Sequence, residues 1–188
     1  MRDGSLTRKK LERCALTLFV EKGVSATTIK DIANKAQVAE GTLYRHYESK
    51  DELAQHLFTS AYETFTKEIT KLAIQQPSLA AKMEVMVRFF CKCYDDDPIL
   101  FNYLLLVQHT QVKVSHGKDI NAHENIVMIF NDAIKKKEIA KKDPNIYASI
   151  VLGIVLQAAL SRVYKRITRT MLQDADELVA AIAGALGY

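Results

Sequence analysis

The sequence has too few cysteines for a disulfide-stabilised protein. Only three of its 188 residues are cysteines, and two of these stand together as Cys91-Lys92-Cys93. Side chains two positions apart on a helix point in different directions, so this pair predicts neither a disulfide framework nor a shared metal. We therefore expect a protein of a reducing cytoplasm.

Motifs of the common enzyme classes are also missing from the sequence. The chain has no glycine-rich phosphate loop, no nucleophile elbow and no paired metal-ligand motif. His109, His116 and His123 recur every seven residues, but Gly117 lies between them in an expected loop. We therefore expect no catalytic residues, no metal site and no cofactor, and predict that the protein is not an enzyme.

Long apolar runs are absent as well. The charged N-terminus leads into an amphipathic pattern without an apolar run, which argues against a secretory signal peptide. The longest nearly apolar run extends from Ile146 to Leu160, includes Ser149 and Gln157, and stops before Arg162. It looks too short and too polar to span a bilayer, so we expect no membrane partner.

Positive charge is concentrated near the N-terminus. Residues 1–50 contain 10 Lys and Arg against 6 Asp and Glu, a net charge of +4, whereas residues 51–188 contain 16 of each kind. The hydrophobic share of 48% and the charged share of 26% are those of a soluble globular chain. A basic N-terminal segment indicates a polyanionic partner such as DNA.

Apolar residues recur at helical spacing along the chain, which predicts an all-α fold. Proline, glycine and N-cap residues separate the segments. The expected helices cover about 7–22, 29–36, 49–75, 79–94, 99–107, 126–134, 144–167 and 175–185. Asp174 with Glu177 is expected to cap the last of them.

Residues 27–50 contain two short helical patterns joined by a tight connection. Thr28 and Asp31 have the spacing of an N-cap pair for the first helix. In the second, only Val38, Leu43 and Tyr47 can be buried together. The residues left outside include aromatic, basic and hydrogen-bonding side chains, which is typical of a helix that enters the major groove of DNA.

The outward residues allow specific roles to be assigned. Gly41 permits close approach of the backbone, while Thr42 and Arg45 can contact base edges, Arg45 best as a bidentate donor to guanine. Tyr44, His46 and Lys50 suit phosphate oxygens. The predicted DNA-binding residues are Thr27, Thr28, Lys30, Ala39, Glu40, Gly41, Thr42, Tyr44, Arg45, His46 and Lys50.

The same segment resembles the DNA-binding domain of the tetracycline-repressor (TetR) family. The resemblance is carried by Gly23, Thr27-Thr28, Ile32-Ala33, Gly41-Thr42-Leu43-Tyr44, His46-Tyr47, Ser49-Lys50 and Leu53. Two residues depart from the family pattern. Gln37 stands where glycine is usual, in a left-handed turn that costs a non-glycine residue about 1 kcal/mol. Ala39 stands where serine is usual, so the second helix lacks a side-chain N-cap.

The resemblance implies an N-terminal three-helix DNA-binding domain over residues 1–50. It further implies a larger helical domain over residues 51–188, which binds a small-molecule effector and forms a homodimer. Aromatic and polar residues among apolar neighbours are candidates for the effector site, with an aromatic or amphipathic effector as the expectation and an ordinary core as the alternative. These candidates are Phe65, Phe90, Tyr94, Tyr103, His109, Phe130, Tyr147 and Gln157.

The last two helices have more apolar surface than one partner can cover. We expect them to form a four-helix bundle with their copies in a dimer, although the core of the protein itself could use both faces. The expected dimer residues are Leu152, Leu156, Leu160, Val163, Leu178, Ala181, Ile182 and Ala185. Two DNA-binding domains predict a near-palindromic operator.

We interpret the chain as a ligand-responsive transcriptional regulator, in function a repressor, that a small molecule releases from DNA. The alternative from another class is a helical ligand-binding or scaffold protein that has lost DNA binding, which Gln37 and Ala39 would favour.

Overall fold

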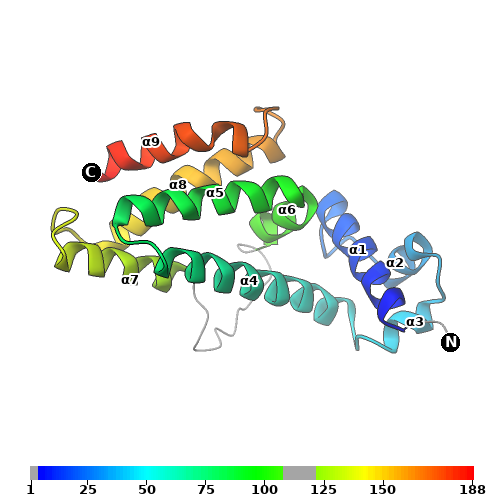
Figure 1. Cartoon of the computed structure of the whole chain (residues 1–188). Coiled ribbons are helices and arrows are strands. Elements are labelled where there is room, and N and C mark those ends of the chain that lie inside the picture. The colour runs from blue at the N-terminus through cyan, green and yellow to red at the C-terminus, as the bar shows by residue number, and fades with distance from the viewer. Residues whose placement is uncertain (1–3, 108–121) are drawn as a thin grey trace. The chain divides into compact units, whose positions relative to one another are not determined.

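The described residues, 4–107 and 122–188 of this computed structural model, form helices and no strand, which confirms the all-α prediction. Figure 1 shows their order along the chain. The elements are α1 (Gly4–Lys22), α2 (Ile29–Ala36), α3 (Glu40–Tyr44), α4 (Lys50–Ile74), α5 (Leu79–Asp96), α6 (Pro98–Val107), α7 (Ala122–Lys135), α8 (Pro144–Val163), the short 3-10 helix η1 (Leu172–Asp174) and α9 (Ala175–Leu186).

The described chain divides into two compact units. The first contains the residues up to Tyr62 together with α6 from Ile99 onward, and the second contains Glu63–Pro98 and the residues from Ala122 to the C-terminus. Helix α4 contributes residues to both units without a break. A functional boundary between residues 50 and 51 remains a prediction, because compactness alone does not show which residues bind DNA.

Helix α6 completes the core of the first unit. The buried ring of Tyr103 stacks on Phe19 with a centroid distance of 5.9 Å, and its hydroxyl donates to the carbonyl oxygen of Ala54 at 2.7 Å. Burial raises the pKa of Tyr103 far above its usual value. The prediction that Tyr103 lines an effector site in the second domain is therefore wrong in this structure, because its phenol is used inside the first unit.

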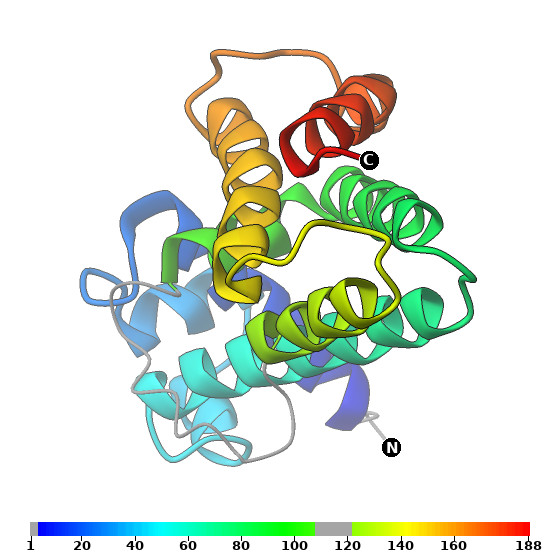
Figure 2. The same ribbon diagram turned by 90° about the vertical axis from the view of Figure 1, so that its left-hand side faces the viewer.

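The second unit is built around α5, α7, α8 and α9. Helix α8 contacts both α7 and α9, and α5 also packs against α9. Figure 2 shows α8 and α9 side by side. Phe130 of α7 and Tyr147 of α8 are buried ring against ring, with centroids 5.4 Å apart, and anchor the contact between these two helices.

Asp174 stabilises the connection from α8 to α9 through two ion pairs. Its carboxylate meets the guanidinium of Arg162 at 2.5 Å, and Arg169 lies 2.5 Å from its other oxygen. Asp174 makes no side-chain capping hydrogen bond to α9, so the predicted cap is wrong. Two guanidinium groups neutralise the carboxylate, and a pair of this kind is stronger than a neutral cap.

Helix α8 also corrects the exclusion of a membrane span. The helix has 20 residues, its most apolar window of 18 residues has a mean hydropathy of 1.8, and only 28% of that window is buried inside the described chain. By length and composition it could cross a bilayer, so that sequence argument does not hold.

Candidate functional site

A reciprocal cap fixes the start of α2. The backbone N–H of Asp31 donates to the hydroxyl of Thr28 at 3.1 Å, and the N–H of Thr28 donates to the Asp31 carboxylate at 2.9 Å. Lys22 pairs with the same carboxylate at 2.7 Å. Lys22, and then Thr28, hold the pKa of Asp31 well below its usual range. The predicted N-cap pair is confirmed.

The turn after α2 requires a left-handed residue. Gln37 has φ 55° and ψ 47°, as the sequence pattern predicted. Its N–H donates to the carbonyl of Asn34 at 3.0 Å, and the next N–H, of Val38, donates to Ala33 at 3.0 Å. These bonds close the end of α2 and direct the chain into α3.

Replacing Gln37 with glycine should stabilise the protein. Glycine adopts this conformation without steric cost, so we expect a gain of about 1 kcal/mol in the free energy of unfolding. Urea denaturation monitored by circular dichroism measures it. Asn34→Gly, an exposed position inside α2, is the control and should destabilise the protein. A loss of stability in Gln37→Gly would contradict the geometry described for the turn.

Helix α3 is anchored on one side and open on the other. Leu43 and Tyr47 are buried in the core of the first unit, while Glu40, Gly41, Tyr44 and Arg45 are exposed. Tyr44 keeps 56% of its surface accessible. No side-chain hydrogen bond caps the helix at Ala39. The predicted burial is confirmed for Leu43 and Tyr47, whereas Val38, which was also expected to be buried, is half-buried.

The outward side chains are partly held in place. Arg45 donates to the hydroxyl of Thr42 at 3.4 Å, so the two residues assigned to base edges lie together. Lys50, at the start of α4, donates to the carbonyl oxygen of Ser25 at 3.3 Å. His46 and Thr42 are half-buried, and Thr28 and Lys30 are exposed on α2.

Thr27 does not belong to this surface. Its side chain is buried, and its hydroxyl donates to the carbonyl oxygen of Gly23 at 2.8 Å. The expected DNA contact of Thr27 is therefore corrected: the residue secures the loop before α2. The two adjacent threonines look alike in the sequence, and only Thr28 faces outward.

A polar cluster that the sequence did not reveal joins α1 to Tyr47, the buried residue that follows α3. Tyr47 donates to the carboxylate of Glu12 at 2.5 Å, and Arg8 donates to Glu12 at 2.8 Å and to the Tyr47 hydroxyl at 3.0 Å. Arg8 also lies 2.9 Å from a ring nitrogen of His56. Burial, followed by the bond to Glu12, raises the pKa of Tyr47 to about 12. Only the spacing of Arg8 and Glu12 on one helix could have indicated this cluster.

The predicted effector residues do not form one site. Phe65 stacks on Phe89 at 5.6 Å and meets Phe90 edge-on at 6.0 Å, in the second unit. Phe90 and Tyr94 are buried on α5, and burial raises the pKa of Tyr94. Phe130 and Tyr147 belong to the core described above.

The two remaining predicted effector residues are Gln157 and His109. Gln157 is exposed on α8, so it does not line an interior site as predicted. His109 and His116 lie outside the described residues, and among those described, no group of three or more potential metal ligands occurs.

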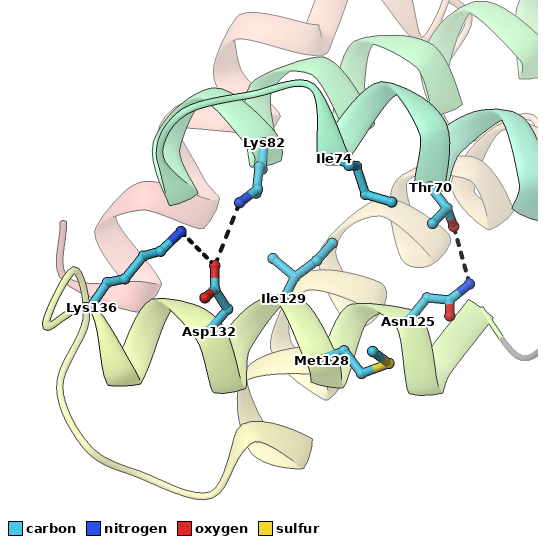
Figure 3. Close-up of a pocket in the computed structure, with 8 residues that line it drawn as sticks. All are labelled: Thr70, Ile74, Lys82, Asn125, Met128, Ile129, Asp132 and Lys136. Carbon is cyan, nitrogen blue, oxygen red and sulfur yellow. Dashed lines mark hydrogen bonds and ion pairs between the residues drawn. The ribbon is translucent and has the colours of Figure 1, made fainter.

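A hollow that the sequence did not reveal lies between α4 and α7. It measures ≈ 350 Å³, and Figure 3 shows its lining side chains. Asn125 of α7 donates to the hydroxyl of Thr70 of α4 at 3.1 Å at one end, and Lys82 and Lys136 approach Asp132 at the other. Ile74 and Ile129 lie between these polar ends.

The predicted dimer residues of α8 and α9 differ in their exposure. Ala181 and Ala185 are exposed, whereas Ile182 is fully buried, which corrects its assignment to a dimer surface. The other residues are half-buried: Leu152, Leu156, Leu160, Val163 and Leu178.

Comparison with known proteins places this geometry in context. Residues 13–57 match the family model described as bacterial regulatory proteins, tetR family. The HTH-type transcriptional regulator SAR2658 of Staphylococcus aureus is 26% identical over 87% of this chain and 83% of its own. The HTH-type transcriptional repressor KstR2 of Mycobacterium tuberculosis is 42% identical over 50 residues, 27% of this chain and 25% of its own.

A solved structure shares the fold over nearly the whole length. The transcriptional regulator FadR from Bacillus subtilis, in complex with stearoyl-CoA, superposes with a TM-score of 0.75 over 93% of this chain and 97% of its own. The sequences are 16% identical. The likeness therefore shows a common architecture.

Proposed function

The chain belongs to the tetR family of bacterial transcriptional regulators, and from that premise we propose that α2 and α3 bind an operator in double-stranded DNA. The observation that carries the proposal is the exposed face of α3. This face carries aromatic and basic side chains, while Leu43 and Tyr47 on the opposite side hold the helix against the core. A helix held in this way can enter the major groove without rearrangement. A gel shift with the DNA upstream of its own gene tests the proposal.

The proposed contacts divide into two kinds. Arg45 and Thr42 contact base edges, and Arg45 is suited to the two acceptors of guanine. Tyr44, His46 and Lys50 contact phosphates, as do Thr28 and Lys30 at the start of α2. Glu40, Gly41 and Ala39 lie at the N-terminal end of α3, where small or short side chains allow the backbone to approach DNA.

Two alanine substitutions distinguish these roles. Arg45→Ala should relax the base preference at one position and cost about 1–3 kcal/mol of operator binding. Lys50→Ala should weaken binding to all sequences and reduce the slope of log K against log salt by about 1 per site. Fluorescence anisotropy at several salt concentrations measures both.

Lys35→Ala is the matched control, because Lys35 is an exposed lysine of α2 that pairs with Glu21 at 3.6 Å and has no assigned DNA contact. Equal effects of Lys35→Ala and Lys50→Ala would show that binding responds only to total charge and would refute the assigned contact.

The protein acts as a homodimer in this proposal, with α8 and α9 forming a four-helix bundle with their copies. Support comes from the uncovered apolar surface of α8 and the exposed small residues of α9, Ala181 and Ala185. A partner copy would cover this surface, so α8 needs no bilayer. The proposed location is the cytoplasm, where its DNA lies.

A small molecule is proposed to release the dimer from DNA. FadR of Bacillus subtilis was solved with stearoyl-CoA, and this supports an acyl-CoA thioester as the first effector to test. Because α4 begins at Lys50 and continues into the second unit, a shift of this helix could move the DNA-binding helices. To change the ratio of the released to the DNA-bound state from roughly 1:99 to 99:1, the effector must prefer the released state by about 5.5 kcal/mol.

A scaffold protein without DNA binding is not favoured. Gln37 adopts the required turn, and α3 keeps its exposed face without a side-chain cap at Ala39. The two departures from the family pattern therefore leave the geometry of the helix-turn-helix in place.

A further inference from the structure

Tyr47 joins the end of α3 to α1. Its backbone N–H donates to the carbonyl oxygen of Leu43 at 3.0 Å and so closes the last turn of α3. Its ring is buried, and at the far end of the ring its hydroxyl donates to the carboxylate of Glu12 at 2.5 Å. The direction in which the chain leaves α3 therefore depends on a contact with α1.

Arg8 of α1 holds this contact in place. Its guanidinium donates to Glu12 at 2.8 Å and to the hydroxyl of Tyr47 at 3.0 Å, and it lies over the Tyr47 ring, 5.3 Å from the centroid. It also lies 2.9 Å from Nε2 of His56 in α4. A guanidinium has no acceptor atom, so the ring nitrogen must accept this hydrogen bond, and His56 is neutral with its proton on Nδ1.

The four side chains of Arg8, Glu12, Tyr47 and His56 form a cluster whose charges balance only while His56 is neutral. Glu12 supplies the one carboxylate among them, and its Oε1 lies 3.8 Å from Nε2 of His56, beyond hydrogen-bond distance. A proton on Nε2 would place two cations against each other with a single carboxylate between them. Either Arg8 or His56 would then have to move away.

Other titratable groups beside this part of α4 are engaged elsewhere. Glu52 stands one turn before His56, but its carboxylate accepts the backbone N–H of Glu48. Tyr103 of α6 donates its hydroxyl to the carbonyl oxygen of Ala54, and burial raises its pKa far above the usual value, so it stays neutral. Histidine is the side-chain type that changes charge within the physiological pH range.

We propose that Arg8, Glu12 and Tyr47 position α3 for DNA binding, and that protonation of His56 breaks their contact and weakens operator binding. The proposal rests on the proposed function of α3 as the DNA-binding helix. The four residues act through the position of the helix, because Tyr47 directly follows His46, which is assigned to a phosphate. A displaced Tyr47 would move that contact away from the DNA.

Operator anisotropy of the full-length wild-type and His56→Gln proteins at about pH 8 and about pH 6 tests the proposal. Glutamine offers Arg8 an acceptor oxygen but gains no proton, so it should keep the cluster closed at both pH values. One linked proton changes affinity by at most about tenfold per pH unit. Over the two units, we expect wild-type affinity to fall about tenfold relative to His56→Gln. His46 is present in both proteins, so its own protonation cancels in the comparison.

Tyr47→Phe separates positioning from a merely structural role. The substitution keeps the buried ring and removes the hydroxyl, so affinity at pH 8 should fall about threefold or more. It should also remove the wild-type pH difference, because α3 no longer depends on Glu12. A loss of stability alone would lower affinity at both pH values and leave their ratio unchanged. The matched control is His123→Gln, since His123 of α7 lies 3.2 Å from Asn145 in the second unit, and it should keep the wild-type ratio.

Equal ratios of affinity between the two pH values in the wild-type and His56→Gln proteins would overturn the proposal. So would a wild-type affinity that rises more steeply toward pH 6, which would make protonated His56 a phosphate contact. Operator binding in either case would leave the proposed DNA-binding function standing. A wild-type protein that bound the operator at neither pH would instead refute that function together with the role of the cluster.

Discussion

Ala181→Arg should abolish high-affinity operator binding without unfolding the protein. Ala181 is exposed on α9, so an arginine side chain at this position can extend into solvent in the monomer. In the proposed dimer, however, two arginines would be placed in a close-packed apolar contact. Because two linked DNA-binding domains gain roughly 100-fold or more over one, we expect a loss of that size in operator affinity.

Sedimentation velocity and operator anisotropy on the same preparation measure this effect. The control is Ala80→Arg, an exposed alanine of α5 away from the predicted dimer residues. It should remain dimeric and keep its operator affinity. A dimeric Ala181→Arg protein with unchanged affinity would refute the assignment of α9 to the dimer contact.

Arg162→Met should cause the largest loss of stability of any single substitution considered. The side chains of Arg162 and Asp174 are only 6% and 10% exposed, and Arg162 also donates to the carbonyl oxygens of Arg169 and Thr170. Removing one partner leaves a buried carboxylate with incomplete neutralisation, which costs about 3 kcal/mol. For a protein of this size that corresponds to a fall of roughly 6–12 °C in the melting temperature.

Differential scanning calorimetry measures the melting temperature. Arg88→Met is the control, because Arg88 forms exposed ion pairs with Glu84 and Asp176 and exposed pairs contribute little. Its melting temperature should be almost unchanged. Equal melting temperatures of the Arg162→Met and Arg88→Met proteins would show that the ion pair between Arg162 and Asp174 does not stabilise the α8–α9 connection.

The local features of the fold could be predicted from the sequence because they depend on neighbouring residues. The cap of α2 needs only Thr28 and Asp31, and the left-handed turn needs only the position of Gln37. The outward face of α3 followed from the burial of Leu43 and Tyr47 at helical spacing. Each of these depends on a few residues adjacent in the chain.

Features that depend on distant residues could not be predicted in this way. Asp174 has the spacing of a helix cap, but its carboxylate forms an ion pair with Arg162 of the preceding helix instead. Tyr103 lies in the apolar segment that forms α6, yet its hydroxyl donates to the carbonyl oxygen of Ala54 in α4. The hollow between α4 and α7 is also lined by Lys82 of α5, and no periodic pattern in the sequence indicates that these three helices meet.

Selection of DNA from a random pool by the purified full-length protein, followed by sequencing of the bound fraction, tests the central claim most directly. We expect enrichment of two inverted half-sites whose centres lie about one turn of DNA apart, with a guanine in each half-site that the Arg45→Ala protein no longer selects. A bound fraction without any enriched sequence at low salt would contradict it.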